Sequence, residues 1–382
     1  NTRLGYKEPV KVALMLPFGA RESNRYFASG ADTLRASSEV RVAAGRSKDF
    51  AEFYSGVLLA LDTLKRNGIS IDLSVYDIAP DSQSVLRALS DPSLKESHLI
   101  IGPAFAQELP QVSAFSRENQ IPMVFPLSNT NPELRSNPYL FHVNTPDSLL
   151  HNRMADEIVR QAAGGNLIMI LPPSDEVQAN RLVQVVKQKA SQGGGTSGRI
   201  HYVEYRPKGE DLVEIQALIN SNMANYIVVP SVRTAEVSKV IPILFGVRER
   251  TRADISLFGM ADWLRFATID PEQIHALNTT IFRSFGLDYS LPETNRFIHK
   301  YRSWYHTEPH AVSPYFHRSD ASSGFSRYGV WGYDVASYFI SAIVEYGRDF
   351  DICLANFKHD QIQFNFDFQR ISNWGGFYNQ GI

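Results

Sequence analysis

The chain has 382 residues, with 38 lysines and arginines against 40 aspartates and glutamates, so its formal net charge is −2. This balance excludes the clustered excess of basic residues that nucleic-acid binding requires. The 43% of hydrophobic and 20% of charged residues are typical of a globular protein, and the longest apolar runs, Val12–Leu16 and Leu167–Leu171, are far too short to cross a bilayer.

The single cysteine, Cys353, excludes an internal disulfide, and a chain of this length can be stable on its hydrophobic core alone. At about 150 residues per domain, the length predicts two to three domains. Because residue 1 is an asparagine, we expect a processed or excised chain whose leader or upstream module has been removed.

The first 125 residues alternate short apolar runs with stretches of helical periodicity, which indicates a parallel sheet covered by helices. We expect strands over 10–18, 69–78, 98–105 and 121–125, and helices over 48–68, 82–94 and 107–119. The helix over 48–68 has the clearest pattern, because its apolar residues from Phe50 to Leu64 recur at spacings that place them on one face.

The same alternation then restarts. Thr145 and Pro146 form a helix-start signal for a helix that runs to Gly165. Strands are expected over 166–171, 199–205, 226–230 and 255–260, and helices over 177–189, 212–220 and 235–245. Two such series in tandem predict an α/β fold of two doubly wound, three-layer lobes.

The remainder of the chain has a different pattern. We expect helices over 292–305 and 333–346, and short strands with tight turns over 364–381. Two long loops, over 21–46 and 307–328, are of a length that is usually functional or mobile.

No motif in the sequence predicts a cofactor, a metal site or a catalytic nucleophile. The GGGTSG segment at 193–198 has GxGxxG spacing, but it follows a predicted helix and precedes a strand, so we interpret it as a flexible loop. His306, Glu308, His310 and His317 form the one dense set of metal-ligand types, but Pro309 breaks the helix that would align them. We therefore expect no enzymatic activity, no cofactor and no bound metal.

Aromatic and polar residues gather instead at the ends of predicted strands, where open α/β sheets bind ligands. They are Phe18, Phe105, Ser128, Asn129, Thr130 and Trp263. Each residue alone is as easily explained by a structural role, so the hypothesis of a ligand site depends on the set.

Six segments in this order resemble the type I periplasmic binding proteins, in particular the branched-chain amino-acid receptors. They are KVALMLPF (11–18), FAEFYSGVLLALDTLKRNG with LSVYD (50–68 and 73–77), IIGPAF (100–105), IPMVFPLSNTNPEL (121–134), YLFHVNTPDS (139–148) and YGVWGYDVASYFISAI (328–343). Within that superfamily the chain is most similar to the Bacteroidota proteins in which such a domain follows LysM peptidoglycan-binding repeats.

The resemblance implies two lobes joined by three crossovers that hold a small molecule between them. The crossovers would lie near 142–145, 284–288 and 349–351. Lobe 1 would comprise residues 1–144 and 289–348, and lobe 2 residues 145–288 and 349–382. The resemblance also implies a periplasmic or otherwise extracytoplasmic location in the cell envelope.

The resemblance further implies site residues. In the amino-acid receptors, loops after strands three and four bind the ligand carboxylate, and Ser128, Asn129 and Thr130 match the strand-four loop. Phe105 and Ala106 fall where those receptors place a carboxylate-binding serine. The acid that holds the ligand ammonium group is best matched by Asp262, and the other strand ends of the second lobe carry Ser174, Ser231 and Arg233.

The leading hypothesis is a non-enzymatic solute receptor or sensor, related to transporter binding proteins, that closes on an amino acid or a related polar metabolite. The alternative is a cell-envelope scaffold with a vestigial cleft, linked to peptidoglycan through an upstream LysM module. On that alternative, the loops over 21–46 and 307–328 would dock an envelope protein or a peptidoglycan component.

Overall fold

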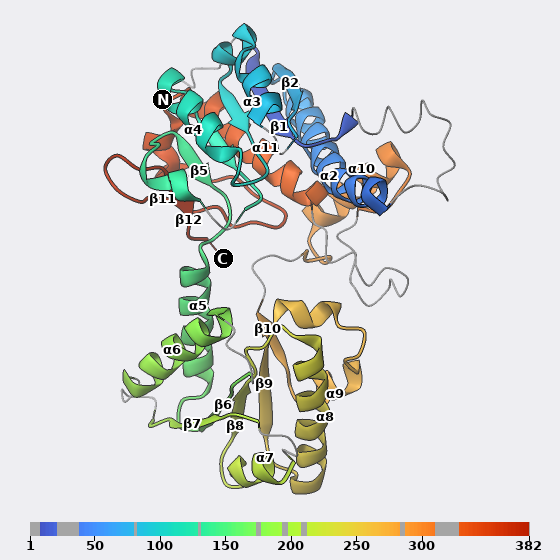
Figure 1. The fold of residues 1–382 in the computed structure, drawn as a ribbon, viewed down its shortest axis with the longest axis vertical. Helices are drawn as coiled ribbons and strands as arrows, with labels where there is room; N and C mark the ends of the chain where they lie inside the picture. Colours follow the sequence, from blue (N-terminus) through green and yellow to red (C-terminus); the bar gives the residue numbers. More distant parts are fainter. Residues whose placement is uncertain are drawn as a thin grey trace. The chain divides into compact units, whose positions relative to one another are not determined.

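A computed structural model describes residues 8–20, 38–79, 82–128, 131–172, 177–192, 198–207, 212–282, 287–309 and 328–381. These residues form two compact units. The first contains the described residues between 8 and 146 together with 287–309 and 328–381, and the second contains the described residues between 147 and 282. Each unit is a sheet with helices on both faces (Figure 1).

The sheet of the first unit has seven strands in the order β11-β12-β5-β4-β3-β1-β2. All pair in parallel except β11, which is antiparallel to β12. The strands are β1 (Val10–Leu16), β2 (Ile71–Asp77), β3 (Leu99–Ile101), β4 (Met123–Phe125), β5 (Leu140–His142), β11 (Phe368–Arg370) and β12 (Phe377–Asn379). The order 2-1-3-4-5 is that of a doubly wound sheet.

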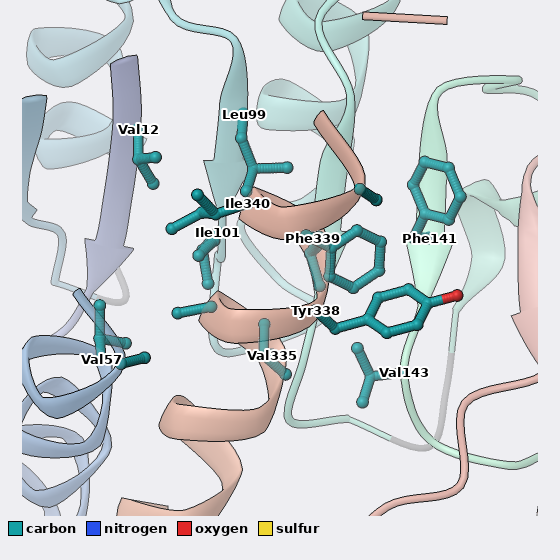
Figure 2. Close-up of a cluster of buried hydrophobic side chains, with 14 of the residues drawn as sticks. Val12, Val57, Leu99, Ile101, Phe141, Val143, Val335, Tyr338, Phe339 and Ile340 are labelled. Atoms are coloured by element: carbon teal, nitrogen blue, oxygen red, sulfur yellow. The ribbon is translucent and has the colours of Figure 1, made fainter. Parts of the chain in front are cut away.

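Helices α2 (Ser38–Arg66) and α11 (Tyr328–Tyr346) cover one face of this sheet, and α3 (Ser82–Leu89) and α4 (Leu109–Asn119) cover the other. Successive residues of β1 point to opposite faces of the sheet, so β1 contributes to both cores. Val12 packs toward α2 and α11, and Ala13 packs toward α3 and α4. Figure 2 shows Val12, Leu99 and Ile101 of the sheet close to α11. Helix α10 (Pro292–Tyr305) packs against α2 through Phe297 and Tyr301.

The C-terminal segment corrects the prediction from sequence. Residues 349–382 were expected in lobe 2, with a crossover near 349–351, but the described part of this segment belongs to the first unit. Strand β12 pairs with β5, and the ring of Phe377 stacks on that of Phe141 at 4.6 Å. The apolar side chains of this segment fill the same core that Phe141 and Phe339 line, which holds it there.

The second unit has five parallel strands in the order β10-β9-β8-β6-β7. They are β6 (Asn166–Ile170), β7 (His201–Tyr205), β8 (Asn225–Val228), β9 (Ile255–Met260) and β10 (Thr280–Phe282). Helices α5 (Asp147–Gln161) and α6 (Val177–Gln192) cover one face; α7 (Leu212–Leu218), α8 (Thr234–Thr251) and α9 (Pro271–Ala276) cover the other.

Short 3-10 helices complete the two units: η2 (Pro92–Glu96), η3 (Pro132–Arg135), η4 (Ala261–Arg265) and η6 (Phe350–Asn356). Among the described residues, no helix combines the length and the apolar character needed to span a membrane.

Candidate functional site

The predicted site residues that the structure describes all follow the carboxyl ends of parallel strands. In the first unit they are Phe18 after β1, Phe105 and Ala106 after β3, and Ser128 after β4. In the second unit they are Ser231 and Arg233 after β8, and Asp262 and Trp263 after β9. Asn129, Thr130 and Ser174 lie outside the described residues. Because parallel strands end at one edge of their sheet, each unit collects its own set of residues at that edge.

Two aromatic pairs lie at the carboxyl edge of the first unit. The ring of Phe18 meets that of Tyr54 edge-to-face with centroids 5.7 Å apart, and Phe105 meets Phe50 in the same way at 5.6 Å. Phe50 and Tyr54 are one turn apart on α2, so one helix face supports both rings from the strand ends. Phe50 is buried, whereas Phe105 is 38% exposed. We call Phe18, Phe50, Tyr54 and Phe105 the aromatic wall.

The backbone after β1 is organised by Asp77, which sequence reasoning missed. Its carboxylate accepts hydrogen bonds from the N–H groups of Phe18, Gly19 and Ala20 at 2.8, 3.1 and 2.9 Å. Asp77 is the last residue of β2 and lies opposite Leu16 in the register, which brings its side chain to the loop after β1. Gly19 has φ 64°, a left-handed conformation in which successive N–H groups can converge on one anion.

The loop after β4 is held by His142 at the end of β5. The His142 side chain is buried and its Nε2–H donates to the carbonyl oxygen of Ser128 at 2.7 Å. The imidazole also lies beside the ring of Phe125, with centroids 6.1 Å apart. Ser128, the first residue of the predicted ligand-binding loop, therefore has its backbone tied to the end of β5.

In the second unit, the buried residues Trp263 and Ser231 hold the loops at the carboxyl edge of the sheet in place. We call these two residues the frame. Trp263 is 2% exposed, and its Nε1–H donates to the Ser231 carbonyl oxygen at 2.9 Å. The Ser231 hydroxyl donates to Glu236 at 2.7 Å and accepts the backbone N–H of Arg233 at 3.1 Å. Both frame residues are buried, so a molecule at this edge would first reach the exposed Arg233 and the half-buried Asp262.

The histidine-rich segment over 306–317 and the glycine-rich segment over 193–198 lie only partly within the described residues. His306 ends α10 with φ 52°, and Glu308 forms an ion pair with Arg302 at 2.6 Å. His310 and His317 lie outside the described residues, as does most of the 193–198 glycine-rich segment. Within the part of the chain that the structure describes, no three His, Cys, Asp or Glu side chains are placed to hold a metal ion.

No protein-family model and no curated protein sequence matches the chain. Solved structures do match it. One is described as a branched-chain amino acid ABC transporter from Rhodospirillum rubrum; it is 14% identical, with a TM-score of 0.61, over 94% of this chain and 93% of that one. An ABC transporter substrate-binding protein from Desulfitobacterium hafniense is 14% identical, with a TM-score of 0.51, over 98% of this chain and 96% of that one.

Full-length LpoA from Haemophilus influenzae also matches, at 11% identity and a TM-score of 0.53, over 98% of this chain. The match covers 56% of LpoA, so this chain corresponds to about half of that protein. Likenesses at these identities establish the fold. The two helix-covered sheets match type I periplasmic binding protein structures, and the fold class predicted from sequence is confirmed.

Proposed function

We propose that the chain is a non-enzymatic ligand-binding domain that closes its two lobes on a small molecule, as a solute receptor or sensor. The observation that carries the proposal is the collection of aromatic and polar residues at the carboxyl edge of each sheet, where open α/β folds bind ligands. Structural neighbours named as a branched-chain amino acid ABC transporter and as an ABC transporter substrate-binding protein support it. The same names support an extracytoplasmic location in the cell envelope.

The proposed contacts come from both units. Phe18, Phe105 and the 128–130 loop would contribute from the first unit, and Arg233, Asp262 and Ser174 from the second. Contacts to both units exist only in the closed form, so a ligand shifts the hinge equilibrium by its differential affinity for that form. Each charge-assisted hydrogen bond to the ligand would contribute about 1.5–3 kcal/mol.

A thermal-shift screen followed by calorimetry tests this function. The library should hold amino acids, short peptides, cell-wall fragments, amines and aromatic acids. We expect at least one compound to raise the melting temperature and to bind with a stoichiometry of one. The absence of any stabilising compound across the library would contradict the proposal.

A scaffold or protein-interaction role is the second candidate, and an exposed apolar surface of the first unit favours it. Trp374 is 82% exposed in the turn between β11 and β12, and Ile352 is 80% exposed in η6. The Arg370 guanidinium links the two sites, because it donates to Asp351 at 2.7 Å and to the Gly375 carbonyl at 2.9 Å. The turn precedes β12, so this surface lies at the amino edge of the sheet, opposite the aromatic wall.

Co-sedimentation with purified peptidoglycan tests the second candidate. The wild-type chain would sediment with the polymer, and Trp374→Ser would remain in the supernatant while the thermal-shift ligands still bind. The loops predicted to dock a partner, over 21–46 and 307–328, lie mostly outside the described residues, and the upstream LysM module stays a prediction.

A further inference from the structure

The carboxyl edge of the first unit joins an apolar surface to a negative charge through one residue, Phe18. The ring of Phe18 belongs to the aromatic wall, and its backbone N–H donates to Asp77 Oδ1. The carboxylate of Asp77, an exposed residue, is therefore held against the backbone that carries the Phe18 ring. Phe18 is thus the residue through which one ligand would contact both the ring surface and the carboxylate.

The backbone N–H groups after β1, which could bind an anion, already bind the carboxylate of Asp77. Three successive N–H groups, of residues 18, 19 and 20, all donate to the Asp77 carboxylate. A ligand carboxylate would have to displace Asp77 to use them, and it would meet the repulsion of a like charge a few ångströms away. At the end of β3, Phe105 and Ala106 supply a ring and a methyl group and no side-chain hydrogen-bond donor.

The carboxylate still has acceptor capacity for a donor from the ligand. An ionised carboxylate has about four acceptor positions. Asp77 Oδ1 takes two of the three backbone hydrogen bonds and Oδ2 takes one, so Oδ2 can accept from an ammonium group as well. Such a bond would be charge-assisted.

The wall provides an apolar surface of fixed shape. Phe50 and Tyr54 hold the outer rings edge-to-face from behind, so Phe105 and Phe18 lose little conformational freedom when a ligand ring packs on them. Resting on the proposed ligand-binding function, we infer that the site takes a ring-bearing ammonium compound and discriminates against ring-bearing carboxylates at this edge.

Calorimetric titration with three probes tests the inference: 2-phenylethylamine, 3-phenylpropanoate and leucine. The first two share a ring and differ in charge, and leucine has no ring. We expect 2-phenylethylamine to bind at least ten-fold more tightly than either of the others. Asp77→Asn should reduce the preference for the amine over the carboxylate to less than three-fold.

Phe105→Ala should weaken binding of 2-phenylethylamine at least five-fold. Because Phe105 is 38% exposed, we expect the Phe105→Ala variant to keep its fold. This variant therefore tests the inference even if Asp77→Asn disturbs the loop after β1. Trp374→Ala is the matched control, an exposed aromatic residue at the opposite edge, and should bind as the wild type does.

Tighter binding of leucine or of 3-phenylpropanoate would overturn the inference and leave the proposed receptor function standing. Equal binding of amine and carboxylate, or an amine affinity that Phe105→Ala does not change, would overturn it as well. Failure of every compound in the broad library would contradict the receptor function itself, so the two failures are distinguishable.

Discussion

Gly56 of α2 and Gly329 of α11 bring the backbones of their helices into contact. A Cβ atom on Gly56 would overlap the carbonyl oxygen of Gly329, and one on Gly332 would overlap that of Phe53. The two helices can approach this closely only because these positions carry no side chain. The crossing lies beside Phe53 and Tyr54 on α2, so it also fixes the helix face that supports the aromatic wall.

Gly56→Ala should therefore destabilise the protein by about 1–3 kcal/mol, because the helices must move apart or distort. Gly246→Ala is the matched control in α8, where the nearest atom to an added Cβ, Arg250 Nη2, is 3.9 Å away. Alanine there should stabilise by up to about 1 kcal/mol through its higher helix propensity. Urea denaturation followed by circular dichroism measures both changes, and equal effects would contradict the packing argument.

The second prediction concerns Asp334 of α11, which anchors the segment before β11. Its carboxylate accepts the backbone N–H groups of Ile362, Gln363 and Phe364 at 2.8–3.1 Å. Asp334 is 1% exposed, and this burial raises the pKa of its carboxyl group to about 7. The stability that it contributes is fully present below the ordinary pKa of 3.8 and is lost as the pH rises through 7.

Melting temperatures of wild type and Asp334→Asn at pH 5.5 and 8.5 check this assignment. The variant should be the less stable protein at pH 5.5, by about 1–3 kcal/mol, because an amide cannot satisfy all three donors. The gap should narrow at pH 8.5, where the wild type has lost the contribution of the protonated carboxyl. A gap that is constant or widens with pH would refute the raised pKa of Asp334.

The third prediction concerns Arg370, which fastens the β11–β12 hairpin to the rest of the first unit. Its guanidinium lies 4.2 Å from the centre of the Phe377 ring and forms an ion pair with Asp351 at 2.7 Å. Lysine cannot reproduce this forked geometry. Arg370→Lys should cost about 1.5–3 kcal/mol and speed hydrogen exchange in residues 368–379.

The control for Arg370 is Arg296→Lys. Arg296 forms an ion pair with Glu293 on the exposed surface of α10, and such a pair contributes about 0–1 kcal/mol. If the two variants exchange at the same rate over 368–379, then Arg370 does not hold the hairpin.

The fourth prediction compares the buried, hydrogen-bonded Trp263 of the second unit with the exposed Trp374 of the first unit. Trp263→Phe removes the indole N–H that donates to the buried Ser231 carbonyl oxygen, at a cost of about 1–3 kcal/mol. Trp374→Phe changes a residue that is 82% exposed and should alter stability by less than about 0.5 kcal/mol. Chemical denaturation checks both, and a small effect of Trp263→Phe would mean that the bond is not part of the frame.

Local sequence patterns were enough to predict the two βα series, because each strand is an apolar run and each helix has an apolar stripe of helical period. They were not enough to place the C-terminal strands. The contact between Phe377 and Phe141 joins residues that are far apart in the chain, and no local pattern says which sheet a short strand will extend.

The candidate site shows the same division. Phe18, Phe105 and Arg233 could be predicted to lie at the carboxyl edge because each follows a recognisable strand. Asp77 was missed because its role depends on the register between β1 and β2, which places it opposite Leu16 and below the next loop. Ser231 and Trp263 are buried by tertiary packing. Their position after a strand in the sequence does not predict whether they are buried or exposed.

The most direct test of the two-lobe receptor is a calorimetric comparison of Phe105→Ala, Arg233→Ala and Trp374→Ala, titrated with the compound that binds the wild type most tightly in the screen. If one molecule contacts both units, each of the first two variants should weaken binding at least five-fold, and Trp374→Ala should not change it. Binding that is lost in the variant of one unit and unchanged in that of the other would contradict a ligand shared by the two lobes.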